Sequence, residues 1–311
     1  MKPKIAEELK NICREIKENH TPLLNLRDIR VRILDCSVNP YISMFDMALM
    51  TWADCGHKWN HASPELRFEV VKGVLDRRAL PLALEAPSFT FLIENCSRSC
   101  FDQIARARIG VVFAARGYKD DYLNGVGFCL PSKLDNDWFL AQEVSELVEK
   151  CKSMYSTIQK KYPNWVARCI LPMYSQYHFI MSMTYAALQG LCLNRMQTTE
   201  MEETVAIAWL LREEVNKKFP LLAHYLRPQC DITKKDTTHN VNGFSKELGV
   251  PHASDNRHPG FDVSMPIEFT EPCTSILILE EKLGITIPRP SDWKDLTWED
   301  LTSLDRDLFT K

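Results

Sequence analysis

The apolar residues of this chain change their spacing along its length, and this change is the strongest constraint on its fold. In residues 29–33, isoleucine and valine alternate with arginine, and Ser88–Ile93 is rich in aromatic and β-branched side chains, so both segments are predicted to be strands. Residues 42–53 and 64–76 instead carry apolar side chains at helical spacing and predict helices. The sequence therefore predicts a mixed α+β fold.

Helical periodicity dominates the second half of the chain. An apolar stripe within residues 144–158 predicts an amphipathic helix. Residues 172–195 are expected to form one long apolar helix, and residues 205–215 to lie in the next, with Thr198 or Thr199 as its N-cap. We therefore expect strands in the early part of the chain and helices after them.

The composition is that of a folded chain without an extreme charge. Of the 311 residues, 45% are hydrophobic, which is enough for a substantial core and excludes wholesale disorder. Lys and Arg total 38 and Asp and Glu 41, so the formal net charge is −3, which argues against a generic nucleic-acid or membrane-surface binder. Three segments are expected: an N-terminal helix over residues 1–28, a main domain over 29–230 and a C-terminal extension over 231–311.

Cysteine usage and hydropathy indicate the compartment. The eleven cysteines are scattered, odd in number and contain no CxxC pair, which is typical of reduced thiols in a cytosol-like environment. The first twenty residues have no apolar segment of the signal-peptide kind, and no apolar stretch is long enough to cross a bilayer. A cytoplasmic protein without membrane contact is the expectation.

A search for common catalytic and metal-binding motifs does not indicate a function. Cys55, His57 and His61 lie within seven residues, but this spacing fits no standard zinc module, and a turn with surface histidines is the favoured interpretation. The sequence contains no HExxH, P-loop, GxGxxG or GxSxG motif. No metal site is predicted.

Arginines gather near the predicted helix at Ser97–Arg108, which comes directly after the second strand. Arg106 and Arg108 lie where this helix gives way to an apolar, extended run at Val111–Phe113. Planar guanidinium groups bind phosphates and carboxylates in a bidentate manner. The alternative is a solvated or salt-bridged pair of arginines, and Arg195 can likewise serve only to complement the dipole of its helix.

Residues 88–122 resemble the signature region of the flavin-dependent thymidylate synthases. That family runs from an aromatic-rich strand into a helix containing Ser-Arg and then into the motif R-H-R-x-x-S-x-N-E-x-S-x-R-Y. The residues at matching positions are Ser97 and Arg98 at the Ser-Arg pair, Gln103 at a glutamine before the motif, and Arg106 and Arg108 at the flanking arginines.

A second stretch extends the resemblance. The segment from Leu171 to Arg195 is similar to the family's long helix, which runs from a Leu-Pro start to a substrate-binding arginine, and Glu203 matches an acidic position in the following helix. The resemblance covers about residues 29–230 and leaves the C-terminal extension unexplained.

The resemblance implies a specific chemistry. Members transfer a one-carbon unit from methylenetetrahydrofolate to C5 of deoxyuridylate (dUMP), with a hydride from FAD that NADPH has reduced, and they use no cysteine nucleophile. An α+β fold and a homotetramer are also implied. The implied cofactor-binding residues are Arg106, Arg108 and Ile109, and the implied substrate-binding residues are Arg98, Gln103, Arg116 and Arg195. No catalytic acid or base is assigned.

The chain departs from the family pattern at several positions. Ala107 replaces the motif histidine, Val111 the first serine, and Phe113-Ala114 the Asn-Glu pair. Arg116 falls either at the second serine or, with a shift of one residue, at the terminal Arg-Tyr. Further departures are Leu80 near a family histidine, Thr184 and Ala186 at an asparagine and an arginine that face flavin and nucleotide, and Thr199 near a second histidine.

Three interpretations remain open. The chain is a divergent flavin enzyme acting on another pyrimidine nucleotide or making another one-carbon product, which the retained arginines favour. Alternatively it is a thymidylate synthase that recruits groups from residues 231–262, such as His239, His252 and His258. The third interpretation is a non-catalytic relative that serves as a structural or partner-binding protein, favoured by loss of the motif's polar residues.

Overall fold

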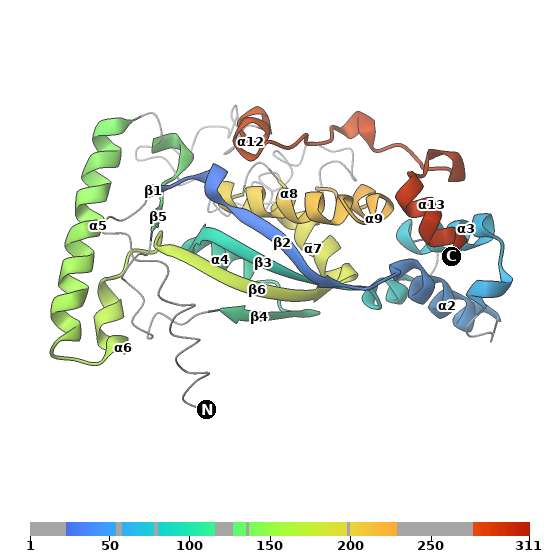
Figure 1. Ribbon diagram of the computed structural model, residues 1–311, viewed down its shortest axis with the longest axis horizontal. Helices are drawn as coiled ribbons and strands as arrows, with labels where there is room; N and C mark the ends of the chain where they lie inside the picture. Colours follow the sequence, from blue (N-terminus) through green and yellow to red (C-terminus); the bar gives the residue numbers. More distant parts are fainter. Residues whose placement is uncertain are drawn as a thin grey trace, which may run out of the picture. The chain divides into compact units, whose positions relative to one another are not determined.

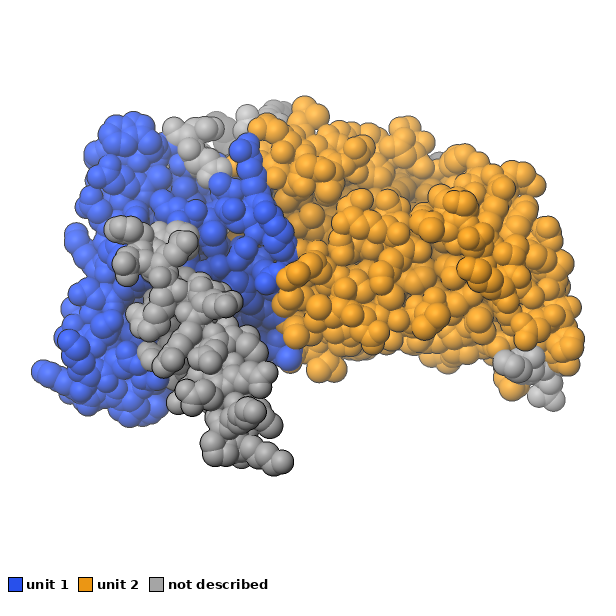
Figure 2. Space-filling view, in the orientation of Figure 1, with its two compact units in different colours: residues 1–30, 93–103, 114–179 blue, residues 31–92, 104–113, 180–311 orange. Residues whose placement is uncertain are grey.

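The computed structural model describes most of the chain as two compact units. The described residues are 23–53, 58–77, 80–115, 127–134, 137–197, 200–228 and 276–311. Unit 1 comprises Met1–Arg30, Ile93–Gln103 and Ala114–Phe179, and unit 2 comprises Val31–Leu92, Ile104–Phe113 and Ile180–Lys311 (Figure 2). The expected division at residues 28 and 230 remains a prediction.

A four-stranded sheet of order β2-β3-β6-β4 confirms the expected α+β fold (Figure 1). The strands are β2 (Arg30–Cys36), β3 (Ser88–Ser97), β6 (Gln176–Thr184) and β4 (Val111–Ala115). Strands β2, β3 and β4 confirm the predicted strands and the extended run. In β3, Phe89, Phe91 and Ile93 are all buried, which is the alternation that a half-buried strand requires.

The expected long helix over residues 172–195 is wrong. Its first half is strand β6, and only Tyr185–Arg195 is helical, as α7. Within β6 every second side chain is buried, and the buried ones are Tyr177, Phe179, Met181 and Met183. A short apolar run suits a buried strand as well as a buried helix, so its periodicity could not separate the two.

Unit 2 contains the helices that the following sections use. They are α2 (Pro40–Ala53), α3 (Pro64–Leu75), η3 (Pro81–Glu85), α7, α8 (Glu202–Asn216), α9 (Pro220–His224), α12 (Ile276–Leu283) and α13 (Ser303–Thr310), with the short turns η2 (Trp59–His61), η6 (Pro290–Asp292) and η7 (Trp298–Asp300). The predicted helices at 42–53, 64–76 and 205–215 are confirmed. The N-cap of α8 is Met201 rather than a threonine, so that prediction is wrong.

Unit 1 is built around a long helix and a two-stranded parallel pair. Its elements are β1 (Leu23–Leu24), η1 (Leu26–Asp28), most of α4 (Arg98–Ile104), β5 (Phe128–Cys129), η4 (Ser132–Leu134), α5 (Trp138–Gln159), α6 (Asn164–Ala167) and η5 (Arg168–Ile170). Helix α5 confirms the apolar stripe at 144–158 and buries Val148 and Tyr155. Helix α4 ends four residues before the expected Arg108, because the chain turns at Ala105 and Arg106.

The C-terminal helix α13 completes an aromatic cluster in unit 2, where it packs beside α3 (Figure 1). Phe309 stacks on Tyr41 with ring centroids 4.5 Å apart. Asp305 of the same helix is almost fully buried and accepts hydrogen bonds from the Tyr41 hydroxyl at 2.5 Å and the Leu221 amide at 2.8 Å. One carboxylate thus ties α13 to both α2 and α9.

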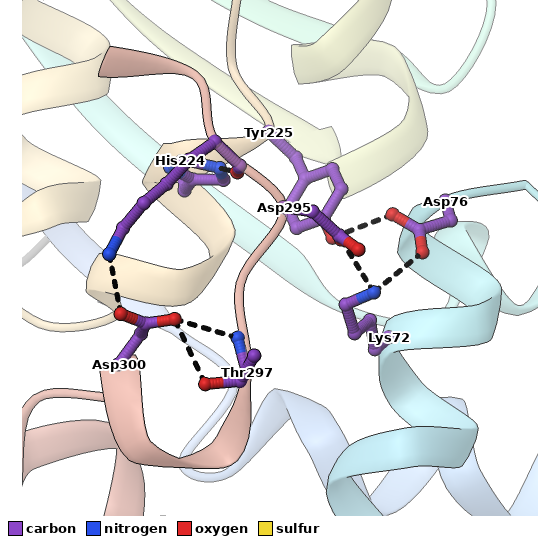
Figure 3. Close-up of polar contacts among 8 residues, drawn as sticks. Lys72, Asp76, His224, Tyr225, Asp295, Thr297 and Asp300 are labelled. Atoms are coloured by element: carbon purple, nitrogen blue, oxygen red, sulfur yellow. Dashed lines mark hydrogen bonds and ion pairs between the residues drawn. The ribbon is translucent and has the colours of Figure 1, made fainter.

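The segment before α13 is fastened by polar contacts (Figure 3). Asp295 forms an ion pair with Lys72 of α3 at 2.7 Å. The carbonyl of Lys294 accepts a hydrogen bond at 2.9 Å from Nε2 of His224, which therefore carries the proton. Asp300 accepts from Lys294 and from the Thr297 amide. These contacts hold residues 294–300 against α3 and α9.

Replacing Asp305 by alanine is expected to destabilise unit 2. It leaves the Tyr41 hydroxyl and the Leu221 amide without their acceptor, and each buried unsatisfied group costs about 1–3 kcal/mol. Urea denaturation measures the loss. Asp307→Ala, on the exposed side of the same helix, is the matched control, and equal losses in the two variants would contradict the role of Asp305.

Unfolding is also expected to depend on His224 between pH 6.5 and about 4. Burial, together with nearby Arg227, lowers the pKa of His224 from 6.5 to about 4. The unfolded chain therefore binds a proton in this window that the folded chain does not, so the free energy of unfolding falls as the pH falls. Denaturation series should show a smaller pH dependence in His224→Gln, and an unchanged slope would refute this. Replacing the exposed His61 by glutamine serves as the control.

Candidate functional site

A cavity of about 720 Å³ in unit 2 brings together residues from three separate segments of the chain. Glu85 comes from η3, a run from Arg106 to Ile109 follows α4, and α7 supplies one of its faces. The cavity is lined by Glu85, Ile104, Arg106, Ala107, Arg108, Ile109, Ala186, Ala187, Gly190, Leu191, Asn194, Arg195, Gln197 and Glu200. Its volume is within the usual range of small-molecule and cofactor sites.

Small residues of α7 form one wall of the cavity, called its floor here, and leave space above the helix backbone. Ala186 and Ala187 lie four and three residues before Gly190, about one helical turn, so both are its neighbours on the same side of the helix. A Cβ atom at Gly190 would meet no other atom within 4 Å, so the space above this residue is open. The floor therefore allows a flat group to approach the helix backbone closely.

Hydrogen bonds at Thr184 fasten the arginine-bearing loop to α7. The Thr184 hydroxyl caps the helix by accepting from the Ala187 amide at 3.2 Å, and it donates to the Glu85 carboxylate at 2.6 Å. The Thr184 amide donates to the carbonyl of Gly110 at 3.1 Å. Thr184 thus connects the end of the arginine-bearing loop, the η3 helix and the start of α7.

Glycine is required at position 110 for two reasons. Its φ of +68° lies in the left-handed region that favours glycine. A Cβ there would also lie 2.9 Å from the Thr184 hydroxyl oxygen and 3.2 Å from the Ala187 Cβ, which is too close. Gly110 therefore lets the loop with Arg106 and Arg108 turn directly over the start of α7.

The charge balance of the cavity is positive. Arg106 and Arg108 are exposed on the loop, and Arg195 is largely buried at the end of α7, where its Nη1 pairs with Glu200 at 2.5 Å. Three guanidinium groups thus face two carboxylates, those of Glu85 and Glu200. The cavity is suited to an anionic ligand, since guanidinium groups recognise phosphate and carboxylate oxygens.

The structure brings four of the predicted site residues together and leaves others elsewhere. Arg106, Arg108, Ile109 and Arg195 line the cavity. Arg98 and Gln103 lie on α4 within unit 1 and are not among the lining residues. Their proposed roles stay predictions.

Arg98 has its own partners in unit 1. It forms an ion pair with Asp102 at 2.8 Å, and its Nη1 donates to the Tyr177 hydroxyl at 3.2 Å. Its guanidinium also lies over the rings of Phe101 and Tyr177. These contacts fix its orientation.

Several predicted groups fall outside the described residues. They include Arg116, the three histidines proposed from residues 231–262, and Cys55 and His57. His61 lies in η2. Within the described ranges no helix has both the length and the apolar character that crossing a membrane requires.

Sequence reasoning missed part of the cavity lining. Glu85 lies on a short turn twenty-one residues before Arg106, and nothing local marks it as a neighbour. Glu200 follows Arg195 by five residues, so an acidic partner near the arginine was visible in the sequence. Ala107 and Ala186, noted as departures from the family pattern, both line the cavity. Thr184, a third departure, caps α7.

Comparisons with known proteins identify relatives over much of the chain. The family described as thymidylate synthase complementing protein matches residues 46–221. The flavin-dependent thymidylate synthase of Sulfurisphaera tokodaii is 27% identical over 158 residues, which cover 48% of this chain and 58% of that protein. The enzyme of the same name from Pyrococcus furiosus is 25% identical over 61% of this chain and 80% of its own length. The chain thus spans little more than half of the first relative.

A solved structure supports the same assignment at the level of the fold. The UMP/dUMP methylase PolB from Streptomyces cacaoi, bound with 5-Br dUMP, superposes with a TM-score of 0.57 at 15% identity. The superposition covers 65% of this chain and 96% of PolB. The family match spans more than half of the 311 residues and confirms the resemblance seen in the sequence. The chain therefore belongs to the thymidylate synthase complementing protein family, that of the flavin-dependent thymidylate synthases.

Proposed function

We propose that the 720 Å³ cavity binds a flavin and a pyrimidine nucleotide and that the protein transfers a one-carbon unit to C5 of that nucleotide. The observation that carries this proposal is the grouping of Arg106, Arg108 and Arg195 around a floor of small residues. FAD and a nucleotide monophosphate both bring phosphate charge, which these guanidinium groups can bind. The family relationship supports the same chemistry.

The residues present fit a flavin. The open space above Gly190 admits a flat ring system, and the loop residues Arg106, Arg108 and Ile109 would hold the cofactor and its phosphates. When bound, reduced FAD supplies the hydride, with NADPH as its reductant and methylenetetrahydrofolate as the one-carbon donor. The protein's own residues bind the cofactor and the nucleotide and orient them toward each other.

Arg195 is the proposed nucleotide-binding group inside the cavity. Its ion pair with Glu200 holds the guanidinium in one orientation, since a paired arginine samples fewer rotamers. From that position it can stabilise negative charge on the phosphate or on the pyrimidine ring as the new bond forms. Arg98, Gln103 and Arg116 are further proposed substrate contacts, and the resemblance supports a homotetramer.

The proposed substrate is dUMP or a closely related uridine nucleotide. The likeness of the fold to a methylase named for UMP and dUMP supports this class. Methylation assays with dUMP, UMP and the cytidine nucleotides distinguish a thymidylate synthase from an enzyme with another pyrimidine substrate.

A non-catalytic relative is the second candidate function, and one observation favours it. Ile109 is 88% exposed and Val112 is 71% exposed, so the segment after the arginines presents apolar side chains to solvent. In the family motif, polar residues occupy the positions around Val112. An apolar surface of this kind suits contact with another protein.

A visible absorbance spectrum of the purified protein, before and after FAD is added, separates the two functions. A bound, reducible flavin close to one per chain is expected. A protein that binds no flavin in excess FAD has lost the proposed chemistry and is the non-catalytic relative.

Removing single arginines is expected to weaken binding without unfolding the protein. Arg106→Ala should weaken flavin binding and Arg195→Ala nucleotide binding, each by about 1.5–3 kcal/mol, the contribution of a hydrogen bond to a charged group. This corresponds to roughly tenfold to hundredfold in Kd. Isothermal titration measures both, with Arg32→Ala on β2 as a charge-matched control. Unchanged affinities in both variants would remove the site assignment.

Filling the space above Gly190 is expected to separate binding from stability. Gly190→Leu places a side chain where no atom lies within 4 Å of the Cβ, so the fold accommodates it while the ligand loses room. Glycine inside a helix costs about 0.5–1 kcal/mol relative to alanine, so Gly190→Ala should raise stability by about that amount. Flavin titration and thermal unfolding test both variants. Full flavin affinity in Gly190→Leu would show that the flavin does not lie on α7.

A further inference from the structure

A second cavity, of about 350 Å³, lies on another face of α7. The helix contributes Gln189 and Leu193, one turn apart, whereas Ala186 and Gly190 face the first cavity. The other walls come from the end of α3 and from residues just after α9. No lining residue is shared between the two cavities.

Arg77 enters this cavity from a strained backbone position. It follows the end of α3 with a φ of 56°, in the left-handed region where helices usually place glycine or asparagine. Its Nη2 donates to the Gln189 side-chain oxygen at 2.9 Å. Glycine would relieve the backbone, so the chain carries an arginine where the fold alone favours a smaller residue. Such positions are enriched at functional sites.

A second arginine is held rigidly at the same cavity. The Nε of Arg227 donates to the carbonyl of His224 at 2.7 Å. Its guanidinium lies over the rings of Tyr225 and Trp293, 5.2 and 5.0 Å from their centroids. A guanidinium fixed by stacking loses little conformational freedom when it binds a ligand.

The acidic group at this cavity is already committed to other partners. Asp76 accepts a hydrogen bond from the Tyr225 hydroxyl at 2.7 Å and pairs with Lys72 at 3.3 Å (Figure 3). Burial and this contact with Asp76 raise the pKa of Tyr225, which stays a neutral donor. Lys72 also balances Asp295. One lysine thus serves two carboxylates, and the cavity lining, which sets Arg77 and Arg227 against Asp76, keeps an excess of one positive charge.

The positive charge near this cavity also affects the pKa of a neighbouring histidine, His224. The pKa of His224 is lowered to about 4, first by burial and then by Arg227, with smaller effects of Arg212 and Lys294. His224 thus remains neutral at pH 7 beside these cations. Arg212 is itself buried and lies over the Trp293 ring.

We propose that this second cavity binds a phosphate group, either as free phosphate or as a small phosphomonoester, through Arg77 and Arg227. Guanidinium forks match phosphate oxygens, and the Gln189 amide holds Arg77 toward the cavity. The apolar side chains of Leu75 and Leu193 leave room for the carbon skeleton of an ester. The site is independent of the flavin and nucleotide cavity and does not rest on the function proposed for it.

Isothermal titration of the full chain with inorganic phosphate and with glycerol 3-phosphate tests the proposal. Arg77→Gly and Arg227→Gln should each weaken binding roughly tenfold or more, as expected for loss of a charge-assisted hydrogen bond. The denaturation midpoint of Arg77→Gly should be unchanged or higher, because glycine relieves the left-handed backbone. Tighter binding of the ester than of phosphate identifies a phosphomonoester, and equal or weaker binding identifies free phosphate.

Two control variants keep the outcome specific to this cavity. Arg32→Ala removes a positive charge from β2 and should not alter phosphate binding. Arg106→Ala removes one from the first cavity, so it separates phosphate bound there from phosphate bound through Arg77 and Arg227. Unchanged phosphate affinity in both Arg77→Gly and Arg227→Gln overturns the proposal. So does loss of binding in Arg106→Ala alone, which assigns the phosphate to the first cavity. Tighter binding of malonate than of either phosphate compound overturns the ligand class.

Discussion

The hydrogen bonds that meet at Thr184 hold the candidate site together. One residue ends β6, caps α7, binds the Glu85 carboxylate and anchors the Gly110 carbonyl. Arg106 and Arg108 are exposed on the loop that leads to Gly110. The position of this loop over the floor of α7 therefore depends on this junction and on a glycine that allows the close approach.

Helix α7 serves two cavities because its faces carry different kinds of residue. Ala186, Ala187 and Gly190 leave space on one side, whereas Gln189 and Leu193 present an amide and an apolar side chain on another. The first cavity takes Arg195 from the end of α7 and two arginines from the loop after α4, and the second cavity takes both of its arginines from outside the helix. The small and apolar residues of α7 thus shape both cavities, and most of the positive charge comes from neighbouring segments.

The departures from the family motif gain a physical interpretation from the cavity. Ala107 and Ala186 stand where the family has larger polar side chains, and both line the wall or floor. Their replacement enlarges the space and removes donors, while the arginines that attract anions remain. Under the proposed function, this combination would weaken recognition of a particular base more than attraction of a phosphate, because charge acts over longer distances than a single hydrogen bond.

Local patterns in the sequence predicted the α+β class, the early strands and the helices α2, α3, α5 and α8, and they marked Arg106 and Arg108 as candidate anion-binding groups. The candidate role of Arg195 came from the family resemblance and not from a local pattern. The spacing of apolar residues shows which face of a helix or strand is buried, so it predicts single elements well. It failed over residues 176–184, where only pairing with neighbouring strands distinguishes a buried strand from a buried helix. Tertiary structure alone brought Glu85 to Thr184, and Arg77 to Gln189, because each pair is about a hundred residues apart and meets only when the elements pack.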